Sequence, residues 1–276
     1  MLAILDENGE IKLGKNDYET TLKLMQTVGE DFVHLATQSL PIQNGDQIVV
    51  EVELANQYLV VQLDETLNES LIFVKGNRWI YQPMLSTNGL ESISENAFRS
   101  KRHYLQVRLA RDYEIKQYRN LALNPHDQKD DSFAYPHAFA NVETRNDATF
   151  FARNAIDGIF ANQSHGSYPY QSWGINRQAD AALTIDFGRP VLLDKIGLTL
   201  RADFPHDSFW TEVSVIFDHQ VTKNFQTKKL SEPQYFDFEA IETTKVIITN
   251  LKKSNQDSSP FPALTEIECF GFNVFS

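Results

Sequence analysis

Hydrophobic and polar residues alternate with a period of two along most of the chain. In 47–54, QIVVEVEL, Glu51 and Glu53 share one face, and the apolar side chains occupy the other: Ile48, Val50, Val52 and Leu54. This alternation predicts a β-strand with one buried face. The same pattern recurs in 57–64, 70–76, 78–82 and 103–110. Residues 1 to about 112 are therefore expected to form a small β-sandwich.

One segment near the N-terminus has a helical period instead. Asn16 can cap a helix over DYETTLKLMQTVG, Glu19 three residues later can complete a capping box, and Gly29 can end the helix. Four apolar residues would then share one face: Tyr18, Leu22, Met25 and Val28. The pattern predicts one helix packed on the first sandwich.

A second series of alternating segments follows an irregular polar stretch at 113–147. These segments are 182–188, 195–201, 211–217, 234–239, 244–251 and 265–272. The alternation of strands with helices that is typical of nucleotide-binding sheets is missing. The expected fold is therefore all-β, with a β-rich domain of unknown role at 1–115 and a second β-sandwich at 116–276.

The charge balance narrows the choice of partners. The chain has 276 residues, of which 42% are hydrophobic and 12% aromatic, and 25 basic against 37 acidic side chains give a net charge of −12. Without a basic footprint, nucleic acid is an unsuitable partner, and an anionic membrane surface is disfavoured too. A neutral partner or a cation fits this overall charge better.

Cysteine content and the N-terminus bear on location. Cys269 is the single cysteine, so no intrachain disulfide can form, and its place in a strand predicts a core residue. The first residues lack the basic start and long apolar run of a signal peptide, and no stretch is long enough to span a bilayer. We expect a cytoplasmic location, or a secreted one if a leader has been removed.

The second half resembles a known family in three segments. NLALNP and ARNAIDG resemble an opening strand and its Ala-x-Asp-Gly turn, ALTIDFGRPVLLDKIGLTLR resembles two core strands, and SPFPALTEIECFG resembles a closing strand. In this order they resemble the discoidin domain, also called the coagulation-factor type C or galactose-binding-like domain, over about residues 118–272. The resemblance implies a jelly roll, sugar binding by loops at one end, as in many bacterial members, and a structural Ca²⁺ nearby.

Three residues are candidates for the Ca²⁺ that the resemblance implies. Asp157 ends the Ala-x-Asp-Gly turn, Asn162 follows in an irregular loop, and Glu266 on the closing strand can return beside them. Calcium binds six to eight hard oxygen ligands, which such a loop can supply. Glu268 is an alternative to Glu266, and Asp157 can equally be a simple turn residue.

The loop RADFPHDSFW at 201–210 has the side chains that a sugar site needs. Its candidate ligand-binding residues are Arg201, Asp203, His206, Asp207 and Trp210. Charged and amide groups bind pairs of hydroxyls, and an aromatic face covers the apolar side of a sugar ring. The alternatives are that Trp210 belongs to the core and that Arg201 forms a salt bridge with Asp203.

Two other segments are expected at the same rim. SHGSYPYQSWGINR contributes His165 and Arg177. The family resemblance implies that Trp173 within it fills the core. In SPFPA, two prolines stiffen a loop that presents Phe261, either as a stacking surface or as a buried anchor.

The tripeptide PHD occurs at 125–127 and again at 205–207. A His–Asp pair can bind a transition metal, but adjacent residues of a strand point apart and no third ligand follows by spacing. A zinc site is therefore not expected.

These residues support three functions of different classes. The first is a non-catalytic carbohydrate-binding protein. The second is a glycan-acting or ester-acting hydrolase with an acid pair from Asp203, Asp207 or Glu212, although no nucleophile elbow, metalloprotease helix or phosphate loop is present. The third is an interaction module in which the first domain binds another protein or forms a homo-oligomer through strand edges. Carbohydrate binding is the function we expect.

Overall fold

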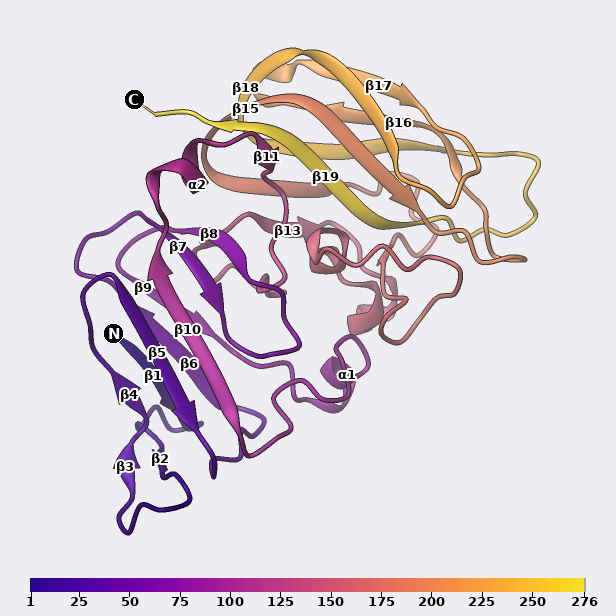
Figure 1. Cartoon of the computed structure of the whole chain (residues 1–276). Helices are drawn as coiled ribbons and strands as arrows, with labels where there is room; N and C mark the ends of the chain where they lie inside the picture. Colours follow the sequence, from indigo (N-terminus) through magenta and orange to yellow (C-terminus); the bar gives the residue numbers. More distant parts are fainter. Residues whose placement is uncertain (276) are drawn as a thin grey trace. The chain divides into compact units, whose positions relative to one another are not determined.

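The computed structural model describes residues 1–275, and its regular secondary structure consists mostly of β-strands (Figure 1). The α-helices among these residues are short: α1 (Thr87–Leu90) and α2 (Asp112–Lys116). The all-β fold class is therefore confirmed. The chain forms two compact units: unit 1 comprises 1–115 and 131–135, and unit 2 comprises 116–130 and 136 onwards. No helix of the described residues is long and apolar enough to cross a membrane.

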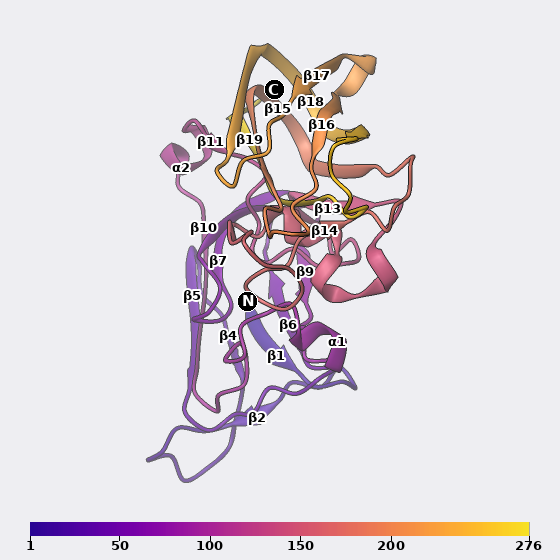
Figure 2. The ribbon, with the colours of Figure 1, turned by 90° about the vertical axis from the view of Figure 1, so that its right-hand side faces the viewer.

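Unit 1 is a sandwich of two antiparallel sheets, seen from a second side in Figure 2. One sheet has the order β4 (Gln26–Thr27), β1 (Leu2–Leu5), β6 (Gln47–Glu51), β9 (Arg78–Tyr81). The other has the order β12 (Ala134–Tyr135), β8 (Ser70–Val74), β7 (Gln57–Gln62), β10 (His103–Leu109), β5 (Phe32–Thr37). A small hairpin joins β2 (Leu13–Gly14) to β3 (Lys23–Leu24).

The core of unit 1 lies between these two sheets. Ile48 and Val50 point into it from β6, as their alternation predicts, and they meet Leu59 and Val61 of β7. Leu54 lies beyond the end of β6 and is exposed, so the predicted strand is too long at this end. Burial of one face of each sheet provides the main stabilisation of the unit.

The predicted helix after Asn16 does not form. The segment contains β3 and β4 instead, and β4 pairs with the edge of β1. Met25 is buried, whereas the other three residues of the expected helical face are exposed: Tyr18, Leu22 and Val28. The backbone of Met25 donates to Lys12 and accepts from Ile4, so pairing with the sheet replaces the helical hydrogen bonds.

One of the two capping-box contacts expected at Asn16 is present, whereas Asn16 Oδ1 accepts from the Gln38 amide at 3.1 Å and not from Glu19. The Asn16 amide donates to the Glu19 carboxylate at 2.8 Å, and the Glu19 amide donates to the Asn16 carbonyl at 3.0 Å. These contacts close a turn without starting a helix. The sequence pattern at Asn16 and Glu19 therefore predicted a local turn correctly. The contacts of Met25 with the sheet determined that strand β4, and not a helix, follows this turn.

Unit 2 is a sandwich in which two long strands contribute to both layers. The predicted segments 182–188 and 195–201 fuse into β15 (Leu183–Leu200), and 234–239 and 244–251 fuse into β18 (Gln234–Lys253). The first half of β15 pairs with β13 (His137–Ala140) and the end of β18; its second half pairs with the start of β18 and with β19 (Ala263–Asn273). β15 bends between its two halves. Register shifts at Asp186/Val191 and Leu193/Lys195 allow this bend, because a bulged strand twists more strongly.

Shorter elements complete unit 2. β16 (Trp210–Ile216) and β17 (Thr222–Gln226) extend one layer beyond β18, while β11 (Arg119–Asn120) and β14 (Trp173–Gly174) pair with β19. The 3₁₀ turns of the described residues lie in the connections: η1 (Thr144–Asn146), η2 (Ala148–Phe150), η3 (Ala152–Ile156) and η4 (Asp218–Gln220).

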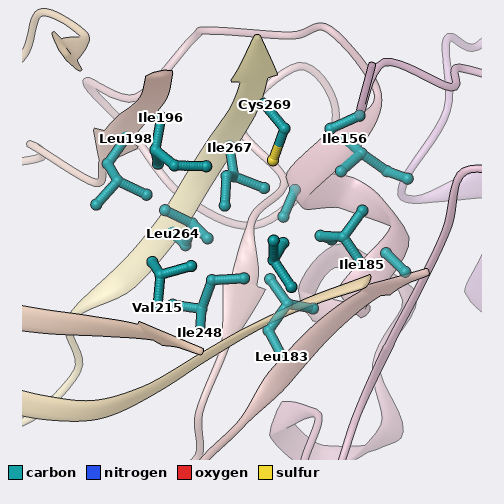
Figure 3. Close-up of a cluster of buried hydrophobic side chains, with 14 of the residues drawn as sticks. Ile156, Leu183, Ile185, Ile196, Leu198, Val215, Ile248, Leu264, Ile267 and Cys269 are labelled. Atoms are coloured by element: carbon teal, nitrogen blue, oxygen red, sulfur yellow. The ribbon is translucent and has the colours of Figure 1, made fainter. Parts of the chain in front are cut away.

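The core of unit 2 contains side chains from both layers and from η3 (Figure 3). Cys269 is fully buried among Ile196, Ile267 and their neighbours, as its strand position predicts, and burial raises the pKa of its thiol far above the usual range. Trp173 is also fully buried, and its indole N–H donates to the carbonyl of Val142 at 3.0 Å. The prediction that Trp173 fills the core is confirmed.

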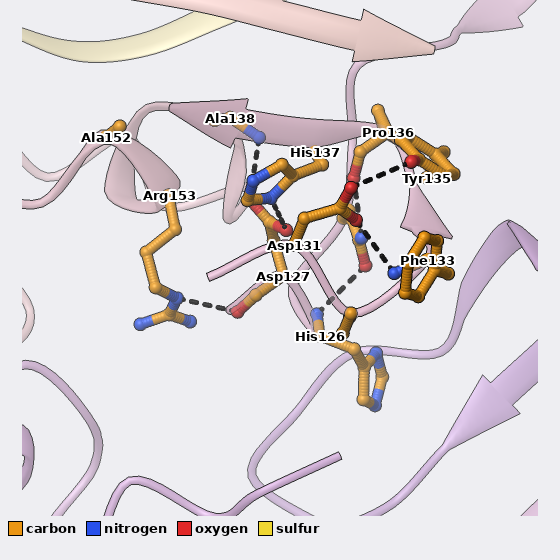
Figure 4. Close-up of polar contacts among 12 residues, drawn as sticks. His126, Asp127, Asp131, Phe133, Tyr135, Pro136, His137, Ala138, Ala152 and Arg153 are labelled. Atoms are coloured by element: carbon orange, nitrogen blue, oxygen red, sulfur yellow. Dashed lines mark hydrogen bonds and ion pairs between the residues drawn. The ribbon is translucent and has the colours of Figure 1, made fainter. Parts of the chain in front are cut away.

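The first PHD tripeptide belongs to a buried polar network in unit 2 (Figure 4). The Asp127 carboxylate accepts from His137 Nδ1 at 2.8 Å and from the Ala138 amide at 2.9 Å, while its carbonyl accepts from Arg153 Nε at 2.8 Å. Burial lowers the pKa of His126 to about 3 and so keeps that ring neutral. The tripeptide therefore anchors β13 to the adjacent loop and has a structural role.

Substitution of Gly271 should destabilise unit 2. This residue pairs with Arg119 on one side and Leu193 on the other, and a Cβ there would lie 1.9 Å from the carbonyl oxygen of Leu192. Because this neighbour is backbone, Gly271→Ala should lower the free energy of unfolding by about 1–3 kcal/mol or more in a urea titration. Glu239→Ala, on an exposed position of β18, should stay within about 0.5 kcal/mol of the unmodified chain. Equal stability of both variants would contradict this packing of β19.

Candidate functional site

A pocket of about 500 Å³ lies in unit 2, where segments around residues 145, 165, 175, 203 and 262 meet. We call it the loop pocket. Its lining includes five of the eight ligand-binding residues expected from the sequence: His165, Arg177, Arg201, His206 and Phe261. The structure thus brings together side chains that are up to 96 residues apart in the chain.

The start of β19 explains why these segments converge. Ala263 and Leu264 pair with Gly174 and Trp173 of β14 on one side, and Leu264 pairs with Leu200 of β15 on the other. The Arg201 amide then donates to the Ala263 carbonyl at 3.0 Å. β14 and β15 end at this point and β19 begins here, so the loops that continue from these three strands lie around one opening.

A buried ion pair supports the floor of the loop pocket. Arg201 Nε lies 2.8 Å from Asp203 Oδ1, although the N–H does not point along a hydrogen bond, and both side chains are almost fully buried. His165 Nδ1 donates to the other oxygen of Asp203. The salt bridge considered as an alternative for Arg201 and Asp203 is therefore present, and desolvation lowers the pKa of Arg201.

Arg201 also joins two loops through their backbones. Its Nη2 donates to the carbonyl of His206 at 3.1 Å and to that of Phe261. The His206 and His165 rings meet edge to face, with centroids 5.2 Å apart. Arg201 and Asp203 hold His165, His206 and Phe261 in position, because a buried charge pair with further hydrogen bonds is costly to rearrange.

The opposite rim of the pocket carries an aromatic ring and a second arginine. Phe261 is 37% exposed, and the Arg177 guanidinium lies over its ring at 4.3 Å from the centroid. Asn176 and Arg177 both have positive φ angles, 47° and 62°, and the Asn176 amide donates to the Thr144 hydroxyl at 2.9 Å. The cation–π contact and this tight turn fix the direction of Arg177.

Three of the expected ligand-binding residues do not line the loop pocket. Trp210 is 1% exposed and packs beside Trp173 in the core, so its prediction as a ligand contact is wrong and the core alternative is correct. Asp207 faces Lys229 at 3.2 Å. Asp203 lies behind Arg201 and His165. Alternation within 201–210 could not separate these roles, because that loop has no regular period.

Three further lining residues come from a stretch that the sequence left unassigned: Thr144, Arg145 and Phe150. This irregular stretch carries no motif. Asn176 also lines the pocket and lies in the expected rim segment, next to Arg177. Gly174 shows why they approach so closely, since a Cβ there would lie 2.8 Å from the Thr144 hydroxyl. A glycine directly after the core Trp173 was the one sequence signal for this contact.

The acid pairs considered for a hydrolase are engaged elsewhere. Asp203 binds Arg201 and His165, and Glu212 accepts from Lys252 and Gln226. Asp207 is paired with Lys229. None of the three lines the loop pocket, so they do not face a common reaction centre there.

A second candidate site is formed by two buried carboxyl groups. The Gly158 amide, next to Asp157, donates to both oxygens of Glu266 at 3.2 Å. Asp157 accepts from Gln171 Nε2 at 2.8 Å and from the Ile159 amide at 2.9 Å. Burial raises the pKa of Asp157 to about 6, and burial together with the charge of Asp157 raises the pKa of Glu266 well above its usual range.

Asn162 and Glu268, the other residues expected to bind calcium, have different surroundings from Asp157 and Glu266. Asn162 donates to the carbonyls of Leu200 and Ser231, both at 2.8 Å, and its own Oδ1 is buried without a hydrogen-bond partner. Glu268 is a neighbouring acid on β19, and burial raises its pKa. Within residues 1–275, no group of three or more His, Cys, Asp or Glu side chains is arranged to hold a metal. A cation here would therefore need amide and carbonyl oxygens as well.

No protein-family model and no curated protein sequence matches this chain. Similar solved structures include the family 32 CBM of NanJ from C. perfringens in complex with galactose, with 18% identity, coverage of 48% of this chain and 91% of that chain, and a TM-score of 0.38. The Streptococcus pneumoniae fucose binding module SpX-3 has 17% identity, coverage of 56% and 98%, and a TM-score of 0.39. The lectin domain of lectinolysin, complexed with Lewis B antigen, has 16% identity, coverage of 55% and 96%, and a TM-score of 0.40. The function must be argued from the pocket itself, since these identities and scores are low.

Proposed function

We propose that unit 2 binds a carbohydrate in the loop pocket and does not transform it. The observation that carries this proposal is the partly exposed Phe261 ring beside nitrogen-bearing side chains within one hollow. A sugar ring has an apolar C–H face and a rim of hydroxyls. An aromatic surface suits the face, and fixed donors suit the rim.

The polar groups of the pocket suit hydroxyl recognition. Arg177 lies over the Phe261 ring and is preceded in the chain by Asn176, and the lining also includes His165 and His206, which Arg201 and Asp203 hold in position. Guanidinium groups can donate two parallel hydrogen bonds to neighbouring oxygens. Because the donors are held before a ligand arrives, binding requires little ordering of side chains.

The same lining supports binding without catalysis. None of the described residues that line the pocket is Asp, Glu, Ser, Cys or Lys. Glycoside hydrolysis by the common route needs two carboxyl groups on either side of the bond, and ester hydrolysis needs an activated nucleophile. The pocket therefore holds groups that can bind, and its lining lacks both a carboxyl pair and a serine or cysteine nucleophile.

We further propose that Ca²⁺ binds between Asp157 and Glu266. Two buried carboxyl groups that repel each other are unfavourable unless they are protonated or share a cation. Calcium prefers carboxylate and amide oxygens, and the unpartnered Oδ1 of Asn162 and Oε1 of Gln171 are buried oxygens of this kind. The cation would tie the Asp157 loop to β19, which also borders the loop pocket.

Removal of the Phe261 ring should abolish most of the sugar binding. In Phe261→Ala, loss of the stacking surface should weaken binding about ten-fold or more, the factor that about 1.4 kcal/mol represents. Calorimetry with a panel of mono- and disaccharides, followed by the best binder on the variant, measures this change. Phe204→Ala is the matched control, because Phe204 is 87% exposed in the neighbouring loop and does not line the pocket.

Two results would contradict the proposed function. One is a panel in which no saccharide binds the unmodified protein. The other is turnover of chromogenic glycosides that disappears in a pocket variant, since a binding module should show none.

Ca²⁺ should raise the melting temperature, and the effect should grow with pH. Without metal, the raised pKa values mean that protons stabilise the fold, so stability should fall as pH rises from about 4 through the pKa of Asp157 near 6. Ca²⁺ competes with those protons. At a hundredfold excess over Kd it should raise Tm by about 5–10 °C at pH 7.5, and much less at pH 5.

A pair of variants tests the assignment of this site. Glu266→Gln removes one of the two charges and should lose the Ca²⁺-dependent rise in Tm, whereas Asp237→Asn, on an exposed side chain, should keep it. An unmodified protein whose Tm at pH 7.5 is the same in Ca²⁺ and in a chelator would contradict the calcium proposal. That result would leave the carbohydrate proposal standing.

A further inference from the structure

The loop pocket is lined by cationic and neutral groups alone. Arg145, Arg177, Arg201, His165 and His206 contribute to its described lining, and no Asp or Glu does. The acidic residues of the same region do not line the pocket, because Asp203 forms a buried ion pair with Arg201 and Asp207 forms an ion pair with Lys229. The pocket therefore presents nitrogen donors without any carboxylate acceptor.

Two of the arginines keep their charge available. Arg201 is neutralised by Asp203, but Arg177 contacts the Phe261 ring and has no carboxylate partner among the described residues. Arg145 is mostly exposed and lies 3.5 Å from Asp147, a separation and exposure at which an ion pair is weak. The local charge at the rim is thus positive although the whole chain carries −12.

A positive pocket is not a general property of this protein. Unit 1 has a hollow of similar size, about 460 Å³, and its lining includes Glu30, Asp31, Glu51 and Glu53. The charge of a concave surface decides which ligand it concentrates, because low-dielectric walls focus the field. The overall charge favours a neutral partner or a cation, but the local charge of the loop pocket favours an anion.

The backbone holds both rim arginines in an uncommon conformation. Arg145 and Asn146 have φ angles of 56° and 52°, and Asn176 and Arg177 have angles of 47° and 62°. The two segments are joined by the hydrogen bond from the Asn176 amide to the Thr144 hydroxyl. Left-handed residues other than glycine are unfavourable and are frequent at binding sites, where surrounding contacts maintain them. Both arginines are thereby positioned before a ligand binds.

We infer that the loop pocket recognises an acidic sugar, with Arg177 and Arg145 binding its carboxylate or sulfate group. This inference rests on the proposed function, because it names the class of sugar for the same site. The part of the Phe261 ring that Arg177 leaves exposed contacts the apolar face of the sugar, and the two guanidinium groups bind the anionic substituent through charge-assisted hydrogen bonds. Such bonds are stronger than those to a neutral hydroxyl, so the acid group decides the selectivity.

Matched sugars that differ in one group test the inference. Calorimetry at low salt compares D-galactose, D-galacturonate and D-galactose 6-sulfate, and D-glucose with D-glucuronate. The acidic member of a pair should bind at least about ten-fold more tightly than its neutral partner. This preference should shrink as salt is raised from 50 to 500 mM, because exposed charges are screened.

Neutral variants of the arginines separate charge from shape. Arg177→Gln together with Arg145→Gln should bring the affinity for the acidic sugar down to that for the neutral one. Lys228→Gln with Lys223→Gln removes the same total charge from residues outside the pocket and should keep the preference. A control pair that loses it to the same degree would show an effect of net charge and would overturn the assignment of the arginines.

The remaining outcomes distinguish the two proposals. Equal binding of neutral and acidic sugars by the unmodified protein would overturn this inference and leave carbohydrate binding intact. Absence of binding by every sugar tested would overturn the proposed function, and the inference with it.

Discussion

The buried ion pair between Arg201 and Asp203 is the interaction on which the loop pocket depends. Arg201 binds Asp203 with one side of its guanidinium group and two loop carbonyls with the other, and Asp203 in turn holds His165. A charge buried in this way is tolerated only while all its partners stay in place, since an isolated buried charge is very costly. The pair therefore links three irregular loops of the pocket to one another.

This arrangement also explains the composition of the pocket surface. Asp203 neutralises Arg201 from behind, so its carboxylate does not reach the lining, and Lys229 draws Asp207 away. What remains in front is the exposed ring of Phe261 with arginine, histidine and amide donors. A protein with an acidic overall charge can hold a basic recognition surface in this way, because exposed charges farther from the ligand than a Debye length of about 10 Å are largely screened.

The two proposed sites share a structural element, β19. Its first residues border the loop pocket, and Glu266, only two residues beyond Leu264, accepts from the Gly158 amide next to the buried Asp157. A bound cation would remove the repulsion between these acids and so stabilise the strand that brings the loops together. Binding of the cation between Asp157 and Glu266 and binding of the sugar in the loop pocket are therefore expected to affect each other.

The sequence by itself determined the strands and the core. Alternation of apolar side chains is a local property, and burial of the apolar face that it creates stabilises the fold. Ile48 and Val50, the long strands of unit 2 and Cys269 follow from this alternation, while the family resemblance implied the place of Trp173. The sequence also predicted five residues that line one pocket, since mixed aromatic and charged loops between strands are typical of binding sites. Only the tertiary structure decided that β4 pairs with β1 where a helix was predicted, that Trp210 is buried, and that Arg145 joins Arg177 at the rim. These outcomes depend on contacts between segments far apart in the chain, and such contacts leave no period in the local sequence.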